Sequence, residues 1–155
     1  MNNYINRKEY IGKLLAYKDK DLIKVISGLR RSGKSTLLEL YREQLQKQGI
    51  GKRQIQFYNF ELPENYLNKT WSDIYFEIKK NLQVEKSNYI FLDEVQNIPF
   101  FEKLVDGLFA TENTDVYITG SNAFLLSSEL ATLLSGRYIE ISILPFSFKE
   151  YLTAR

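Results

Sequence analysis

Apolar residues recur along the chain with two different spacings, which predict alternating strands and helices. Short runs that are nearly all apolar are typical of buried strands, whereas apolar residues three and four positions apart mark one face of a helix. Strands are predicted at 22–26, 55–60, 89–92, 116–119 and 138–143, and helices at 2–20, 36–48, 71–82, 99–109 and 123–134. This alternation favours an α/β fold in which helices cover both faces of a parallel sheet.

The composition of the strands also predicts their order in the sheet. Residues 89–92 and 116–119 are nearly all apolar, as expected of central parallel strands that are covered on both faces. Residues 138–143 alternate between apolar and polar, and residues 55–60 are mixed, so both segments are expected at edges. With the strands numbered along the chain, these features match the order 5-1-4-3-2.

The first predicted strand leads into Gly28-Leu29-Arg30-Arg31-Ser32-Gly33-Lys34-Ser35, which matches the phosphate-binding pattern G-x-x-x-x-G-K-[ST] at every fixed position. In this motif, backbone N–H groups and the positive end of the next helix bind phosphate, and the glycines let the backbone approach closely. Lys34 should reach the β- and γ-phosphates, and the Ser35 hydroxyl should bind Mg²⁺. The residues expected to bind nucleotide here are Gly28, Arg30, Arg31, Ser32, Gly33, Lys34, Ser35 and Thr36.

Two alternatives remain open at this loop. A Gly-rich turn can match the motif without binding a nucleotide, although the strand before it and the helix after it favour a phosphate site. Arg30 and Arg31 occupy free positions of the motif. They could add positive field near the phosphates or could be solvated surface residues.

The third predicted strand delivers Asp93 and Glu94 at its carboxyl end, where ligands bind in open α/β sheets. We expect Asp93 to hold Mg²⁺, through water, and Glu94 to orient and polarise the water that attacks the γ-phosphate. Alternatively, the two acids only cap the next element. A phosphate loop about 60 residues earlier favours the catalytic interpretation.

Three further candidates also have open alternatives. Ser121 or Asn122, after the fourth predicted strand, could contact the γ-phosphate or the attacking water, or could form the N-cap of the next helix. Arg137 could complete the site of a neighbouring subunit as an arginine finger, or could be a surface arginine. Asn59, late in the second predicted strand, could contact Glu94 and hold it inactive.

Composition restricts the chemistry and the class of protein. The chain has 155 residues, of which 44% are hydrophobic, enough for one domain with a core. It has no cysteine and no histidine, which excludes disulfides, Cys or His metal sites and His-based triads. A net charge of +2 does not indicate the excess of basic residues that is typical of nucleic-acid-binding proteins. No apolar run approaches 18 residues and the start lacks a signal-peptide pattern, so we expect a cytoplasmic protein without a membrane span.

Taken together, these motifs resemble the AAA+ superfamily of ATPases, and more closely a bacterial and archaeal family of predicted AAA+ ATPases. That family has an Arg-Arg-x-Gly-Lys-[Ser/Thr] loop, a Leu-Asp-Glu-[Val/Ile]-Gln motif, and a Gly-Arg pair followed by Pro-[Leu/Phe]-Ser-Phe-x-Glu-[Tyr/Phe]. Here the three patterns occupy residues 30–35, 92–96, and 136–137 with 145–151. The resemblance implies a three-layer αβα P-loop NTPase fold with the 5-1-4-3-2 sheet, and it implies ATP and Mg²⁺.

The resemblance also implies roles for particular residues and a larger protein. The roles of Lys34, Ser35, Asp93 and Glu94 carry over directly; a sensor at Ser121 or Asn122, and self-association through an Arg137 finger, follow from the same comparison. A helix is predicted to begin near residue 147, close to the last residue. We therefore expect residues 1–155 to be an ATPase core whose helical lid and carboxyl-terminal domain lie elsewhere in a longer protein.

The leading hypothesis is an ATPase module that drives a change in an attached domain or partner, with a nucleic-acid-related partner as one candidate. The alternative is a nucleotide-dependent binding switch with little turnover. A GTPase is disfavoured because the guanine-reading Asn-Lys-x-Asp sequence is absent; residues 68–71 fail at the last position. A small-molecule kinase is disfavoured because only Arg137 and Arg155 follow the two acids, whereas such enzymes need lid arginines.

Overall fold

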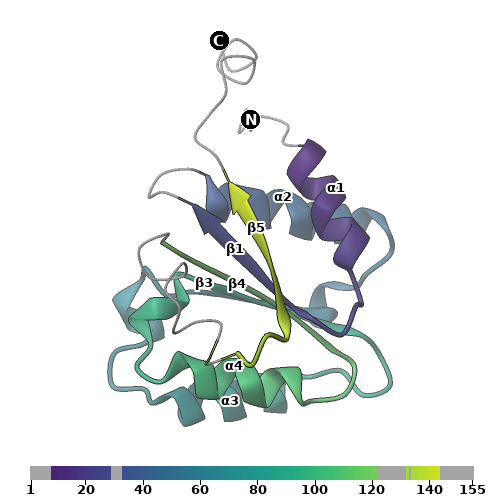
Figure 1. The fold of residues 1–155 in the computed structure, drawn as a ribbon. Helices are drawn as coiled ribbons and strands as arrows, with labels where there is room; N and C mark the ends of the chain where they lie inside the picture. The colour runs from purple at the N-terminus through teal and green to yellow at the C-terminus, as the bar shows by residue number, and fades with distance from the viewer. Residues whose placement is uncertain (1–7, 29–32, 122–131, 133, 144–155) are drawn as a thin grey trace.

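The structure is a computed structural model that describes residues 8–28, 33–121, 132 and 134–143 (Figure 1). The strands are β1 (Ile23–Gly28), β2 (Ile55–Asn59), β3 (Asn88–Asp93), β4 (Thr114–Ser121) and β5 (Tyr138–Ile143). The helices are α1 (Lys8–Tyr17), α2 (Lys34–Lys47), α3 (Trp71–Lys80) and α4 (Phe101–Phe109), with short 3-10 helices η1 (Lys52–Gln54), η2 (Pro63–Asn65) and η3 (Val95–Asn97).

The five strands form one parallel sheet in the order β2-β3-β4-β1-β5. This confirms the predicted order 5-1-4-3-2. The register pairs Val25 of β1 with Ile118 of β4 and with Glu140 of β5. The central strands β1 and β3 are buried along their whole length, whereas β5 alternates between exposed Glu140 and buried Ile141. The predicted positions of β2 and β5 at the edges of the sheet are therefore confirmed.

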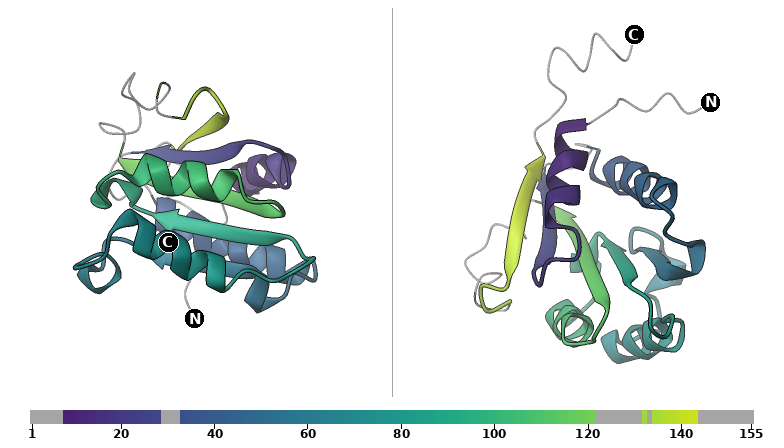
Figure 2. Two further views of the ribbon diagram at one scale, coloured as in Figure 1. Left: turned by 90° about the horizontal axis from the view of Figure 1, so that it is seen from below. Right: turned by 90° about the vertical axis from the view of Figure 1, so that its right-hand side faces the viewer.

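Helices cover both faces of the sheet and create two apolar cores (Figure 2). Successive strand residues point to opposite faces. Tyr89 and Phe91 of β3 join a core with α1 and α2, in which Tyr41 and Phe91 meet edge to face at 6.0 Å between ring centroids. Ile90 and Leu92 join the core formed with α3 and α4. The α/β class and the three-layer arrangement are thus as predicted.

Several element boundaries differ from the predicted ones for local reasons. The predicted helix at 2–20 ends at Tyr17, because the chain turns at Asp19, whose φ is 62°. The helix predicted from residue 99 begins at Phe101, after Phe100 adopts a left-handed conformation. Strand β4 runs from Thr114 to Ser121, longer than its apolar stretch, because polar residues at both ends continue the backbone ladder. The predicted helix at 123–134 lies almost entirely outside the described residues.

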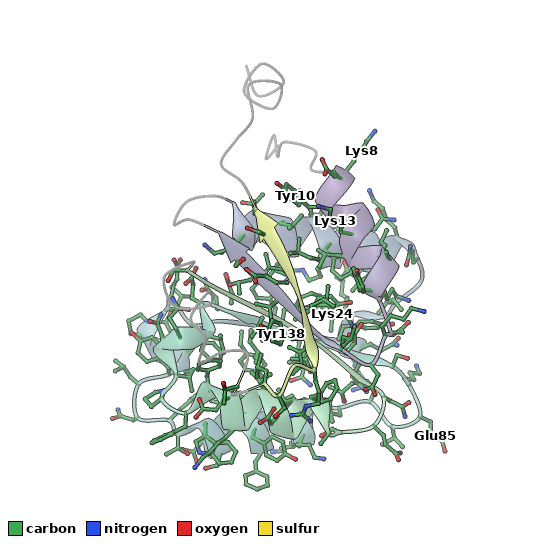
Figure 3. All side chains as sticks on the ribbon, in the orientation of Figure 1. Lys8, Tyr10, Lys13, Lys24, Glu85 and Tyr138 are labelled. Atoms are coloured by element: carbon green, nitrogen blue, oxygen red, sulfur yellow. The ribbon has the colours of Figure 1, made fainter. Side chains whose placement is uncertain are left out.

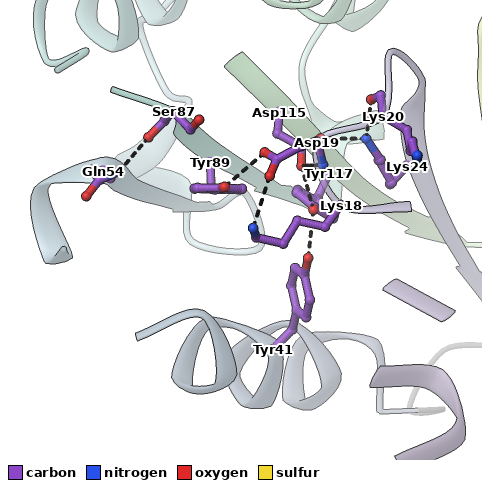
Figure 4. Close-up of polar contacts among 10 residues, drawn as sticks. All are labelled: Lys18, Asp19, Lys20, Lys24, Tyr41, Gln54, Ser87, Tyr89, Asp115 and Tyr117. Atoms are coloured by element: carbon purple, nitrogen blue, oxygen red, sulfur yellow. Dashed lines mark hydrogen bonds and ion pairs between the residues drawn. The ribbon is translucent and has the colours of Figure 1, made fainter. Parts of the chain in front are cut away.

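A buried ion pair joins β1 and β4 near their amino ends (Figure 4). Lys24 Nζ donates to Asp115 Oδ1 at 2.6 Å and to the backbone carbonyl of Lys20 at 2.7 Å. The other oxygen of Asp115 accepts from the Tyr117 hydroxyl at 2.7 Å and from the backbone N–H of Asp19 at 3.0 Å. Lys24 lies inside the molecule, whereas Lys8 and Glu85 point outward (Figure 3). These bonds tie the α1–β1 turn to the sheet.

No helix among the described residues has the length and apolar character needed to cross a bilayer.

Candidate nucleotide site

The carboxyl ends of β1, β3 and β4 meet at one edge of the sheet because the strands are parallel and adjacent. Gly28 at the end of β1 is paired in register with Ser121 at the end of β4. A cleft of about 590 Å³ lies at this edge. Its described lining residues are Lys34, Glu61, Glu94, Gln96, Asn97 and Ser121. The structure therefore brings together the predicted phosphate lysine, the predicted base and one of the two sensor candidates.

The end of the predicted phosphate loop is shaped by Gly33, which has φ 91° and forms the N-cap of α2. A residue with a side chain would be strained in this left-handed conformation. Lys34, Ser35 and Thr36 form the first turn of α2, so the helix begins two residues earlier than predicted. The first N–H groups of a helix have no partner within the helix, and they lie at the positive end of its dipole, so the start of α2 favours an anion. Arg30, Arg31 and Ser32 lie outside the described residues.

The side chain of Lys34 is directed toward the cleft although it is only 4% exposed. Its Nζ donates to the carbonyl oxygen of Gly28 at 2.9 Å and lies 4.0 Å from Glu94 Oε1. The ammonium group thus lies between the end of β1 and the carboxylate after β3. This is the position from which it can exchange a backbone carbonyl for a phosphate oxygen.

Asp93 is fully buried and accepts hydrogen bonds from two hydroxyl groups. Ser35 Oγ donates to Oδ2 at 2.6 Å, and Thr119 Oγ1 donates to Oδ1 at 2.5 Å. Burial raises the pKa of the Asp93 carboxyl, and the neighbouring charge of Glu94 acts in the same direction, whereas the two hydroxyls and Lys34 oppose the shift. The two predicted metal ligands, Ser35 and Asp93, are therefore in direct contact.

This pair of oxygen donors fits Mg²⁺. Mg²⁺ prefers oxygen ligands, and in nucleotide sites it takes one or two from the protein and others from phosphate and water. The described residues contain no group of three or more His, Cys, Asp or Glu that could hold a metal without such help. Ser35 and Asp93 therefore suit a metal that arrives with a phosphate ligand better than one held by the protein alone.

Glu94 follows Asp93 in a left-handed conformation with φ 57°. Its backbone N–H donates to Thr119 Oγ1 at 2.9 Å, so the threonine hydroxyl binds the backbone of one acid and the carboxylate of the other. Gln96 Nε2 donates to Glu94 Oε2 at 2.6 Å. A non-glycine residue held at positive φ stores strain, which is often found at functional sites. Here the bond of the Glu94 backbone to Thr119 and the bond of its carboxylate to Gln96 hold the residue at the cleft.

Ser121 lines the cleft because β4 lies between β1 and β3, as predicted. Its role as a sensor of the γ-phosphate remains a prediction. Asn122, the other sensor candidate, lies outside the described residues.

Arg137 lies at the opposite end of the sheet from the cleft. Its carbonyl oxygen accepts from the backbone N–H of Ile23, the first residue of β1. Its Nη2 is 2.8 Å from Asp106 Oδ1, and the guanidinium lies over the Phe109 ring at 5.0 Å from the centroid. The structure does not bring Arg137 to the nucleotide site of its own chain. Its predicted role as a finger concerns a second copy and remains a prediction.

The predicted contact between Asn59 and Glu94 is not found among the hydrogen bonds of the described residues. Asn59 Oδ1 instead accepts from the backbone N–H of Glu61 at 3.0 Å. Gln96 occupies the place beside Glu94.

Sequence reasoning did not assign roles to Gln96 or Thr119. Gln96 was visible only as the last residue of the Leu-Asp-Glu-Val-Gln motif. Thr119 was visible only as a polar residue at the end of an apolar strand. Its contacts with both acids depend on the pairing of β3 with β4, which the local sequence does not encode.

Comparison with known proteins decides the family. A family model described as an AAA domain matches residues 20–152. The chain belongs to this AAA-domain family. The family and the fold together indicate a nucleotide-binding module of the ATPase type.

Relatives of this AAA domain come from bacteria and archaea. An uncharacterized protein of Haemophilus influenzae is 49% identical over 152 residues, which cover 97% of this chain and 38% of the relative. Uncharacterized protein MJ1544 of Methanocaldococcus jannaschii is 34% identical over 84% of this chain and 28% of its own length. Uncharacterized protein MJ1637 of the same organism is 32% identical over 94% of the chain and 30% of its own. The AAA domain thus spans about a third of the length of these relatives.

Proposed function

We propose that this AAA domain binds ATP with Mg²⁺ and hydrolyses it. The observation that supports the proposal best is the position of Asp93, which contacts the Ser35 hydroxyl of the phosphate-loop motif at 2.6 Å. The adjacent Glu94 and the motif lysine Lys34 line the same cleft. Phosphoryl transfer to water needs groups of this kind: a hydroxyl and a carboxylate for the metal, a second carboxylate for the water and an ammonium group for the phosphates.

The phosphates of ATP would bind at the amino end of α2. Lys34 would exchange its bond with the Gly28 carbonyl for bonds with the β- and γ-phosphates. The ammonium charge lowers the energy of the phosphate groups most when charge builds on the oxygen between them. This difference between the ground state and the transition state is what accelerates the reaction.

Ser35 and Asp93 would hold Mg²⁺ through their oxygen atoms, Asp93 through a water. The ion, when bound, would supply positive charge that neutralises charge on the phosphate groups. In the structure the Ser35 hydroxyl donates to Asp93. It would have to turn its lone pairs toward the ion, while the carboxylate would stay ionised beside that charge.

Glu94 would act on the attacking water. The water oxygen forms a bond to the γ-phosphorus while the bond from phosphorus to the β–γ bridging oxygen breaks. ADP leaves with that oxygen and its electron pair, and a proton of the water passes to the Glu94 carboxylate and then to solvent. The products are ADP, inorganic phosphate and a proton.

A binding switch with little turnover is the second candidate. The switch is favoured by the two contacts of the Glu94 carboxylate, a hydrogen bond from Gln96 and an ion pair with Lys34, because they engage the group that would act as base. Phosphate release by the wild type and by Glu94→Gln separates the two candidates. We expect the variant to be at least about 100-fold slower, because it cannot accept the proton. Equal rates would leave only the switch.

The action of the longer protein is a wider proposal. Because the AAA domain spans about a third of its relatives, hydrolysis would drive a conformational change in an attached domain or partner, with nucleic acid as one candidate substrate. We expect this to take place in the cytoplasm.

The first experiment is a calorimetric titration of ATP in the presence of Mg²⁺. We expect micromolar binding by the wild type and a loss of at least tenfold in affinity for Lys34→Ala, because the variant lacks the charge that faces the phosphates. Equal affinity of both proteins, or no binding by the wild type, would contradict the proposed site. Circular dichroism of both proteins controls for folding.

A further inference from the structure

We propose that Gln96 positions both Glu94 and the attacking water: its side-chain amide group holds the carboxylate, and its carbonyl oxygen accepts a hydrogen bond from the water. This inference rests on the proposed function, because it assigns a further residue to the same hydrolytic step. It concerns a residue that follows the two acids along the chain and lines the same cleft.

The bond from Gln96 to Glu94 is short and charge-assisted. Gln96 Nε2 lies 2.6 Å from Glu94 Oε2. Chemistry fixes which end of the amide faces the carboxylate, since the –NH₂ group is a donor and the amide oxygen can only accept. Hydrogen bonds to an ionised group are stronger than neutral ones. Gln96 therefore restricts the rotation of the carboxylate that is expected to act as base.

The other end of the same amide has no partner among the described residues. Gln96 Oε1 is buried, and it is the single buried side-chain oxygen or nitrogen in the described part of the chain that makes no hydrogen bond. A buried acceptor without a donor destabilises the fold. Such a group is retained when its partner arrives with the substrate, and the residue borders the cleft in which the phosphates would bind.

The segment around Gln96 is held firmly in place. Val95 and Ile98 are buried, and Asn97 Nδ2 donates to the carbonyl oxygen of Phe60 at 2.8 Å. The backbone N–H of Glu94 is bonded to Thr119. The short helix η3 therefore presents Gln96 from a fixed backbone, as a group that orients a reactant must be presented.

These contacts provide two acceptors for one water. A water has two O–H donors; one can point to Glu94 Oε1, which Gln96 does not bond, and the other to Gln96 Oε1. A lone pair of the water oxygen then remains for the γ-phosphorus. Without the amide, the Glu94 carboxylate is free to turn closer to Lys34 Nζ, which already lies 4.0 Å from Oε1. A closer ion pair would engage both the base and the phosphate lysine more tightly.

The test compares three variants of the purified chain. Gln96→Met has a similar length but removes the donor and the acceptor. Gln96→Glu keeps acceptor oxygens but loses the donor and places a second carboxylate against Glu94. The matched control is Gln54→Met, because Gln54 also uses its side chain for hydrogen bonds, to Gly51 and Ser87, but lies on η1 (Figure 4). Each protein is assayed for ATP hydrolysis and for binding of a non-hydrolysable ATP analogue and of ADP with aluminium fluoride, which imitates the transition state.

We expect both Gln96 variants to lower kcat by about 10- to 100-fold, as loss of a supporting hydrogen bond does in comparable sites. Affinity for the non-hydrolysable analogue should stay within about threefold of wild type, whereas affinity for ADP with aluminium fluoride should fall in parallel with kcat. Gln54→Met should match wild type in all three assays. A purely structural role for Gln96 would instead lower all affinities together.

The outcomes separate this inference from the proposed function. If the wild type hydrolyses ATP and Gln96→Met matches it in kcat and in aluminium fluoride binding, the role of Gln96 is refuted and the ATPase stands. If the wild type binds ATP but neither hydrolyses it nor binds the aluminium fluoride complex, both hydrolysis and the role of Gln96 are refuted.

Discussion

Two buried aspartates on neighbouring strands show how the same residue type serves different purposes. Asp115 is bonded to the ammonium group of Lys24, whereas the hydrogen bonds of Asp93 come from two neutral hydroxyls. Burial raises the pKa of both carboxyls, because charge is less stable away from water. Asp115 has a positive counter-charge in direct contact within the fold, whereas Asp93 is expected to gain one in direct contact only when Mg²⁺ binds.

This difference predicts that Asp93→Asn stabilises the protein in the absence of nucleotide. The pKa of Asp93 is higher in the folded than in the unfolded chain, so the folded chain binds more protons and its stability falls as pH rises between the two values. The variant removes that cost. We expect a Tm increase of about 2–4 °C at pH 7 and none below about pH 4, where the carboxyl is protonated in both states. Mg²⁺-dependent ATP affinity should fall at least about tenfold.

Asp115→Asn is the matched control for that variant. It leaves the buried Lys24 ammonium without its counter-charge, which costs about 3–5 kcal/mol. Denaturation in urea should therefore show opposite changes in the free energy of unfolding for the two variants. Destabilisation by both variants would contradict the view that the buried charge of Asp93 lowers the stability of the nucleotide-free protein.

Local sequence signals decided where individual elements begin. At α3, the Thr70 hydroxyl accepts from the backbone N–H of Asp73 at 3.1 Å, and the Asp73 carboxylate accepts from the backbone N–H of Thr70 at 2.9 Å. This is a capping box, for which the Thr-x-x-Asp pattern of residues 70–73 is typical. Such caps need only residues three positions apart, so they can be read without the tertiary structure.

Thr70→Ala should lower the Tm by about 2–4 °C, because an unsatisfied N–H is left at the start of α3. The bonds with Thr70 lower the pKa of Asp73, so their contribution is complete above the pKa of an unfolded aspartate and is lost as pH falls through the lower folded value. The variant keeps the Thr70 backbone N–H, the main cause of the lowered pKa, so its deficit should shrink only in part as pH falls from 7 to 3 in thermal unfolding. Ser87→Ala is the control, since Ser87 offers its backbone carbonyl to Gln54. Absence of any deficit at pH 7 would contradict the capping role.

At the scale of the whole molecule, the candidate nucleotide cleft and Arg137 lie at opposite ends of the sheet. The cleft is at the carboxyl ends of the strands, and Arg137 precedes β5 and bonds to Asp106 of α4. An arginine placed this far from its own site can act on a nucleotide only in another copy of the chain. The predicted finger can therefore act only if copies of the chain assemble.

Mixing two inactive variants tests that assembly. Arg137→Ala keeps its nucleotide site and lacks the finger, whereas Lys34→Ala lacks the site and keeps the finger. If the finger acts between copies, each variant alone should lose on the order of 10³-fold in hydrolysis, and the mixture should recover a measurable part of it. Asp106→Ala, which frees Arg137 but retains it, should stay active. No recovery in the mixture, with full activity of Arg137→Ala, would assign Arg137 to packing alone.

The sequence by itself determined the α/β class and the order of the strands, and it contains the motif of a phosphate loop. Strand order followed from apolar composition, because central strands must be apolar on both faces and edge strands need not be. Gly33, Lys34 and Ser35 could be identified because they are contiguous, and Asp93 and Glu94 because they end an apolar strand.

Only the tertiary structure decided which side chains complete the site. Thr119 joins Asp93 to Glu94 because β4 pairs with β3, and Ser121 lies beside Gly28 because β4 pairs with β1. Gln96 took the place expected for Asn59 because the turn at Glu94, held at φ 57°, directs η3 back to the carboxylate. Contacts of this kind depend on the pairing of strands distant in sequence and on backbone conformations that a pattern of residue types does not specify.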